Sequence, residues 1–180
     1  MDNVENALWH RFFRSCSILL SIEATLSIIL SYYAGFFLSK QFHFTTAPVA
    51  GLWCAISGII VLQVLVHESF SAAWIRILGS FLGAATSYVF SMLMGYTMPA
   101  LAVCVFITVI LTSLFQIKVT FRLASLTAAI VIIVGSLEPA VSPLINAFSR
   151  FAESAIGAVI AIIITALFYP LRKKLQLLNH

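Results

Sequence analysis

Residues 76–118 read RILGSFLGAATSYVFSMLMGYTMPALAVCVFITVILTSLFQIK, and 41 residues without a formal charge separate the two basic ends. A helix that crosses the hydrocarbon core of a bilayer needs about 20 apolar residues, so this stretch is long enough for two. Gly95 and Pro99 stand near its middle, and a glycine followed closely by a proline is typical of a turn. The stretch therefore predicts two membrane-spanning helices, over about residues 74–94 and 98–115, joined by a short turn.

The composition of the whole chain is that of a membrane protein. Of its 180 residues, 62% are hydrophobic and only 9% are charged, and the mean hydropathy is +1.08. Soluble domains have about 45–50% apolar and about 25% charged residues, so the composition excludes a soluble enzyme, a nucleic-acid-binding domain and a disordered tail. The basic pI near 9.2 is then a question of which membrane face the basic residues take, and we expect no nucleic-acid partner.

The remaining charges divide the rest of the chain into four more apolar segments. These are expected to form helices over about residues 15–39, 48–66, 119–137 and 147–169. The last helix is expected to stop at Pro170, and His67 and Glu68 are expected to end the second. The apolar runs are long and do not alternate in polarity, which favours helices over the strands of a β-barrel. We predict an all-α integral membrane protein in which residues 1–180 form one transmembrane domain without a separate soluble domain.

The basic residues predict the orientation of six helices in the membrane. Six spans place both termini on the same side. With a cytoplasmic N-terminus, eight of the ten Lys and Arg residues lie on the cytoplasmic side, and only Lys40 and Arg150 lie outside. Because cytoplasmic loops of membrane proteins are enriched in Lys and Arg, we predict that both termini are cytoplasmic.

The chain also repeats itself when it is shifted by 74 residues. The matches are Arg76 with Arg150, Gly83 with Gly157, Ala84 with Ala158, and five positions of residues 50–59 with their counterparts in 124–133. Each half then holds three helices, repeat 1 over about 15–94 and repeat 2 over about 97–170. Three is an odd number, so the second half must be inserted upside down. Such an inverted repeat is common in transporters, whereas chance similarity between two apolar segments is the alternative.

Arg76 and Arg150 are the first candidates for binding a substrate. Each is expected to begin the third helix of its half, from opposite faces of the membrane. An arginine in or near hydrocarbon is expensive, so it is kept where it faces water, an ion pair or a substrate. A guanidinium group also matches a carboxylate in bidentate geometry, which predicts an organic anion as substrate. The alternative is that both side chains extend to lipid headgroups as anchors.

Two acidic residues are candidates for proton coupling or ion pairing. Glu23 is the only formal charge well inside an otherwise apolar span, where it could carry a proton, pair with a pathway arginine, or have a purely structural role. Glu153 follows Arg150 by three residues, and this spacing predicts a local ion pair. The counterpart of Glu153 in the first half is Gly79, so the two ends of a pathway would differ in charge.

Gly79, Gly83 and Gly157 are candidate helix-packing residues. Two glycines four residues apart allow close contact between helices, which could either leave room for a pathway or serve tight packing alone. The three cysteines lie inside apolar runs without the spacing of a metal site. The sequence has no nucleophile elbow, phosphate-binding loop or zinc-protease motif. We therefore expect no catalytic residues, no metal and no cofactor.

Three segments of the chain carry a family resemblance. They are AGLWCAISGIIVLQ at 50–63, RILGSFLGA at 76–84, and RFAESAIGAVIA at 150–161, whose helix ends in Tyr169 and Pro170. An arginine followed by glycines in two helices resembles the fusaric acid resistance and aromatic acid exporter superfamily, to which plant aluminium-activated malate transporters are distantly similar. The resemblance covers about residues 15–170.

The resemblance implies a function and a set of partners. It implies six transmembrane helices in the bacterial inner membrane, a homodimer in the lipid bilayer, and export of organic anions, often aromatic carboxylates, from the cytoplasm. By position, Arg76 and Arg150 are the residues that would govern anion passage. Two other functions remain open at this point, a passive anion channel and a non-transporting membrane subunit that assembles a partner.

Overall fold

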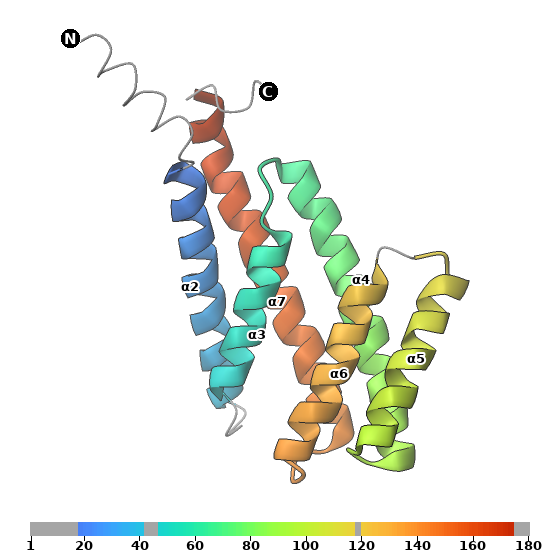
Figure 1. Ribbon diagram of the computed structural model, residues 1–180. Helices are drawn as coiled ribbons and strands as arrows, with labels where there is room; N and C mark the ends of the chain where they lie inside the picture. Colours follow the sequence, from blue (N-terminus) through green and yellow to red (C-terminus); the bar gives the residue numbers. More distant parts are fainter. Residues whose placement is uncertain (1–17, 42–46, 118–119, 175–180) are drawn as a thin grey trace, which may run out of the picture.

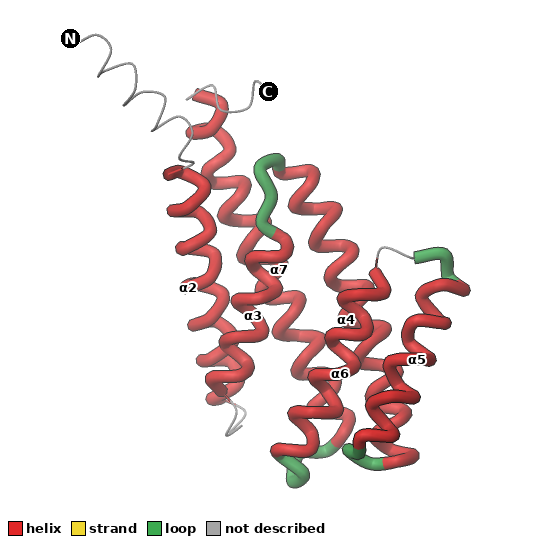
Figure 2. Tube along the Cα trace, viewed as in Figure 1, coloured by secondary structure: helices red, strands yellow, loops and turns green. Residues whose placement is uncertain are grey.

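The computed structural model describes residues 18–41, 47–117 and 120–174, and these residues form helices and short loops only (Figures 1 and 2). The helices are α2 (Ile18–Gln41), α3 (Ala47–Val61), α4 (Val66–Met94), α5 (Met98–Leu114), α6 (Phe121–Leu137) and α7 (Pro143–Lys174). The expected helix starts near residues 15 and 119 lie outside the described residues. The six described helices agree with the all-α prediction.

Three of the described helices are long and apolar enough to cross a membrane. They are α2, α4 and α7, with 24, 29 and 32 residues. At a rise of 1.5 Å per residue, α4 and α7 are roughly 43 and 48 Å long. The shorter helices α3, α5 and α6 have 15 to 17 residues and are also apolar. Large hydrophobic side chains are exposed on every described helix, as expected of a surface that faces lipid.

The expected start of α4 near residue 74 is wrong, because the helix begins at Val66. His67 and Glu68 lie in its first turn and do not end the preceding helix. Ser69 stabilises this start, since its Oγ accepts a hydrogen bond from the Gln63 backbone N–H at 2.9 Å. Charged residues mark the edge of a membrane but do not end a helix. As a consequence Arg76 lies in the interior of α4 and not at its beginning.

The expected limits of α7, from residue 147 to Pro170, are also wrong. The helix begins at Pro143, in a position where a missing backbone N–H does no harm, and continues through Pro170 to Lys174. A proline inside a helix costs about 3 kcal/mol, so other contacts must hold this end in place. Arg172 provides them, because its guanidinium group bonds to α2 and to the loop between α3 and α4.

The turn predicted in the long uncharged stretch is confirmed. Gly95 ends α4 with a φ of +68°, a backbone conformation that favours glycine. Thr97 then caps α5, where its side-chain oxygen accepts a hydrogen bond from the Ala100 N–H at 3.3 Å. Pro99 lies in the first turn of α5, where it is tolerated.

The helices form two groups of three, one of α2, α3 and α7 and the other of α4, α5 and α6 (Figure 1). In one group α2 packs against α3, and in the other α5 packs against α6. The long helices α4 and α7 pack against each other between the groups. The partners are exchanged, since α3 packs mainly on α7 and α6 packs mainly on α4.

Two apolar clusters lie between α4 and α7, one beside α3 and the other beside α6. The first contains Val61, Ala73 and Ala158, with Ile77 and Ile162 packed against them. The second contains Val131, Ala147 and Ala84, with Phe151 and Tyr88 packed against them. Every pair of counterparts on α4 and α7 is separated by 74 residues, whereas the two valines on α3 and α6 are separated by 70. The matching register of the short helices is therefore one helical turn away from the shift of 74 that aligns the long ones.

The three glycines allow close approach between helices. A Cβ atom at Gly83 would lie less than 3.0 Å from the Ala124 carbonyl on α6, and one at Gly157 equally close to the Cys54 carbonyl on α3. Gly79 also packs on α6, where a Cβ would lie 3.0 Å from that of Leu123. Since backbone atoms cannot move aside as the end of a side chain can, these positions set the spacing of α4 from α6 and of α7 from α3.

We predict that Gly83→Leu lowers the free energy of unfolding by about 1–3 kcal/mol or more, because the new side chain has no space against α6. Ala85→Leu, two residues further on the exposed face of the same helix, is the matched control and should change it by less than about 0.5 kcal/mol. Reversible unfolding of the purified protein in mixed micelles measures both. Equal effects of the two substitutions would contradict the packing described for α4 and α6.

Candidate functional site

Two arginines lie inside the helical bundle. The side chain of Arg76 is 0% exposed and that of Arg150 is 2% exposed. Arg76 follows the first residue of α4 by ten positions, and Arg150 follows that of α7 by seven. Neither side chain reaches the protein surface, so neither has the position of a headgroup anchor. Burying a guanidinium group is expensive unless other groups satisfy it, so the surroundings of each are informative.

Arg76 is held by residues of two other helices. Its Nε and Nη2 atoms donate to the Ser57 Oγ of α3 at 3.1 and 2.9 Å, and Nη2 also lies 3.4 Å from the Ser154 Oγ of α7. The guanidinium carbon is 4.8 Å from the centre of the Trp53 ring. This distance is within the range of a cation–π interaction, which is stronger where water is excluded.

The local structure of α3 explains why Ser57 can accept two hydrogen bonds. The Ser57 hydroxyl donates its own proton to the Trp53 carbonyl, four residues earlier, at 2.9 Å. Both lone pairs of the oxygen then remain available for Arg76. Trp53 and Ser57 are four residues apart and share one face of α3, so the ring and the hydroxyl meet the same guanidinium group.

Two buried donors, one on Arg76 and one on Trp53, have no hydrogen-bond acceptor among the described residues. Arg76 Nη1 and Trp53 Nε1 find no hydrogen-bond partner within the described part of the chain. A buried donor that is left unpaired costs about 1–3 kcal/mol. Together with the positive charge, these two donors make the Arg76 cluster (Arg76, Trp53, Ser57 and Ser154) suited to an anionic acceptor.

Arg150 forms a second site on α7. Its Nη2 lies 2.8 Å from Glu153 Oε1, in an ion pair of which both side chains are buried. Arg150 Nε and Nη1 and Glu153 Oε2 have no partner among the described residues. Arg150 precedes Ser154 by four residues, about 6 Å of helix rise, so α7 carries both sites in succession. No hydrogen bond within the described ranges joins Arg150 to Arg76.

The two sites differ at several positions, since the counterparts of Trp53 and Ser57 at a shift of 74 are Thr127 and Val131. The counterpart of Glu153 at a shift of 74 is Gly79, so Arg76 has no carboxylate three residues later and turns to serines, whereas Arg150 pairs with its own helix neighbour. Ser80 is the counterpart of Ser154, and it lies 3.5 Å from the Thr127 hydroxyl of α6. The correspondence of Ser80 with Ser154 is a further match at the shift of 74 that was not among the predicted site residues.

Glu23 lies away from both arginine sites and pairs with Arg172. Arg172 Nε donates to Glu23 Oε1 at 2.7 Å, and Nη2 pairs with Oε2. Arg172 Nη1 donates to the backbone carbonyls of Gln63, at 3.2 Å, and Val64. This ion pair joins α2, α7 and the loop between α3 and α4. From the sequence, Arg172 was expected only on the cytoplasmic face, and its pairing with Glu23 was not predicted.

The arrangement can bind a charged group but contains no catalytic constellation among the residues described. No three His, Cys, Asp or Glu side chains lie close enough there to hold a metal ion. Guanidinium groups, an indole N–H and serine hydroxyls predominate, and these are the groups with which proteins hold carboxylates. Arginines buried between long apolar helices are typical of functional sites in membrane proteins.

The chain belongs to the fusaric acid resistance protein-like family, whose model matches residues 25–164. Membership indicates a function in membrane transport or resistance. The match includes both arginine sites, whereas Glu23 and Arg172 lie outside it. No curated protein and no solved structure gives a significant match.

We predict that Glu23→Gln and Arg172→Gln each lower the free energy of unfolding by about 3–5 kcal/mol, because each leaves a buried charge without its partner. The double variant should lose less than the sum of the two single losses, as expected of residues in direct contact. Arg122→Gln removes an exposed arginine and is the control. Unfolding in mixed micelles measures the cycle, and additive losses would contradict a direct Glu23–Arg172 interaction.

Proposed function

We propose that this protein transports organic anions, small or aromatic carboxylates, across the membrane, with Arg76 and Arg150 as successive binding residues. The observation that carries the proposal is the set of buried donors without acceptors within the described residues: Arg76 Nη1, Trp53 Nε1, and Nε and Nη1 of Arg150. An incoming carboxylate supplies the acceptors that the described residues do not.

The chemistry of these donors favours a carboxylate over a simple halide. A carboxylate has two oxygens, so it can accept hydrogen bonds from two separate donors at once, whereas a halide offers a single centre. At Arg76 one edge is already held by Ser57, and Nη1 remains for the substrate. The Trp53 N–H is a second donor close to the same guanidinium group, because the indole ring lies beneath it.

Glu153 acts in this proposal as an internal competitor of the anion. It occupies Arg150 Nη2 through one carboxylate oxygen, so an anion that binds Arg150 competes with it. Protonation of Glu153 weakens the ion pair and frees Arg150, which couples a proton to anion movement. Glu23 is the weaker candidate for coupling, because Arg172 holds both of its carboxylate oxygens.

We infer that the transport domain is an inverted repeat of three plus three helices, α2–α4 and α5–α7. The exchanged packing of α3 on α7 and α6 on α4 supports this, because a two-fold relation converts each contact into the other. The paired clusters on α4 and α7, and the matching close approaches at Gly83 and Gly157, support it further. In such transporters the binding site lies at the interface of the repeats, which here is the contact between α4 and α7.

In the membrane, we infer six spans with both termini in the cytoplasm of a bacterial cell, in the inner membrane. The three short apolar helices would complete the spans together with their loops, since α3, α5 and α6 are each packed against a longer neighbour. A homodimer in the lipid bilayer is the proposed working unit.

We predict that Arg76→Ala and Arg150→Ala each reduce uptake of radiolabelled benzoate into proteoliposomes by about tenfold or more, because each removes a charge-assisted hydrogen bond to the anion. Arg122→Ala, which removes an exposed arginine, should retain the flux of the unmodified protein. Size-exclusion profiles establish that each variant is folded. Unchanged flux in both Arg76→Ala and Arg150→Ala would rule out the arginine pathway.

A further inference from the structure

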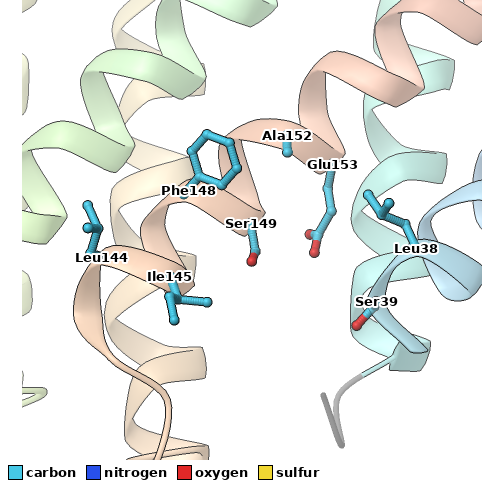
Figure 3. A pocket seen from close by; sticks show the side chains of 8 residues that line it. All are labelled: Leu38, Ser39, Leu144, Ile145, Phe148, Ser149, Ala152 and Glu153. Carbon is cyan, nitrogen blue, oxygen red and sulfur yellow. The ribbon is translucent and has the colours of Figure 1, made fainter. Parts of the chain in front are cut away.

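A pocket of about 530 Å³ lies between the C-terminal end of α2 and the N-terminal half of α7 (Figure 3). Its lining residues are Leu38, Ser39, Leu144, Ile145, Phe148, Ser149, Ala152 and Glu153. Leu144, Ile145 and Phe148 are exposed, so the pocket opens to the surroundings of the protein, which for this apolar surface is lipid. Its volume is that of pockets that bind drug-sized molecules.

Two buried polar atoms of residues that line this pocket have no hydrogen-bond partner among the described residues. Glu153 Oε2 and Ser39 Oγ are without a hydrogen bond in the described part of the chain, although their side chains are only 3% and 4% exposed. They come from different helices. In Figure 3 the Glu153 carboxylate lies between Ser149 of its own helix and Ser39 of α2. The pocket therefore combines apolar walls with a carboxylate oxygen and a hydroxyl group that a ligand could satisfy by hydrogen bonds.

We propose that this pocket binds an uncharged amphiphile, an apolar body with a single hydroxyl head. The hydroxyl group donates to Glu153 Oε2 and accepts from Ser39 Oγ, while the apolar body lies along Leu144, Ile145 and Phe148. This site shares Glu153 with the proposed anion site at Arg150 but takes a different class of ligand, because it presents a carboxylate where the anion sites present guanidinium groups.

The charges around the pocket decide against a charged ligand. Arg150 already neutralises Glu153 through its other oxygen. A cation would therefore leave a net charge in an apolar pocket, which is unfavourable. An anion would be repelled by the free carboxylate oxygen. A hydroxyl group adds no charge and satisfies both polar atoms.

The unpaired atoms also decide against a plain hydrocarbon chain. A lipid tail or an alkane would fill the volume but leave Glu153 Oε2 and Ser39 Oγ unpaired in a pocket now sealed from water. The head group should therefore contribute to binding, and this distinguishes a built site from a surface that lipid tails merely cover.

The test uses two photoreactive probes, a diazirine-bearing 1-octanol and the same chain without the hydroxyl group, on the purified protein in detergent. Mass spectrometry of peptides locates the labelled residues. We expect saturable labelling around residues 38–39 and 144–153 by the alcohol, competed by unlabelled 1-octanol, with an apparent affinity about tenfold higher than that of the headless probe. Equal affinities of the two probes, or labelling elsewhere only, would overturn the proposal.

Variants assign the interaction to its residues. Ala152→Phe fills the pocket and should abolish labelling there, whereas Ala102→Phe, the same change at an exposed position on α5, should not. Ser39→Ala and Glu153→Gln should weaken labelling by the alcohol severalfold and leave labelling by the headless probe unchanged. If Ala152→Phe does not fold, the comparison of the two probes on the unmodified protein still tests whether the hydroxyl group contributes to binding. Undiminished alcohol labelling of a folded Ala152→Phe protein would contradict the site.

Discussion

The burial of the Arg76 guanidinium group is the constraint on which the rest of the structure depends. A buried cation must be solvated by the protein, and here α3 supplies Trp53 and Ser57 while α7 supplies Ser154. Both helices must therefore approach α4 at the same level. Gly157 makes this possible, because a Cβ there would lie 2.9 Å from that of Ser57 and would push α3 away from α7. The glycine thus acts on Arg76 through the spacing of the helices that hold it.

Asymmetries within the repeated pattern give the two arginines different surroundings, because Trp53 and Ser57, which hold Arg76, correspond to Thr127 and Val131. Where the first half has Gly79, the second has Glu153, which holds Arg150 on its own helix. Glu153 uses one carboxylate oxygen for this ion pair and directs the other toward the pocket between α2 and α7. The same side chain therefore lies between a pocket that presents an acceptor and an interior whose N–H donors lack acceptors within the described ranges.

Much of the fold could be predicted from the sequence because hydrophobicity and turn residues act locally. The turn at Gly95 and the apolar helices follow from patterns within a few residues. The position of Arg76 inside α4 could not be predicted, because charged residues mark the edge of a membrane without showing where a helix begins. The partners of the buried charges could not be predicted either. Glu23 and Arg172 are 149 positions apart, and Arg76 and Ser154 are 78 apart, so only the packing of the helices brings them together.

A crystal structure of the protein with 4-bromobenzoate tests directly whether a carboxylate binds at Arg76. Anomalous diffraction locates the bromine. We expect the carboxylate to lie about 2.7–2.9 Å from Arg76 Nη1, the distance of a charge-assisted hydrogen bond, with the Trp53 N–H beside it. Bromobenzoate bound only at sites remote from both Arg76 and Arg150, with the spare donors of both arginines satisfied by other protein groups, would contradict it.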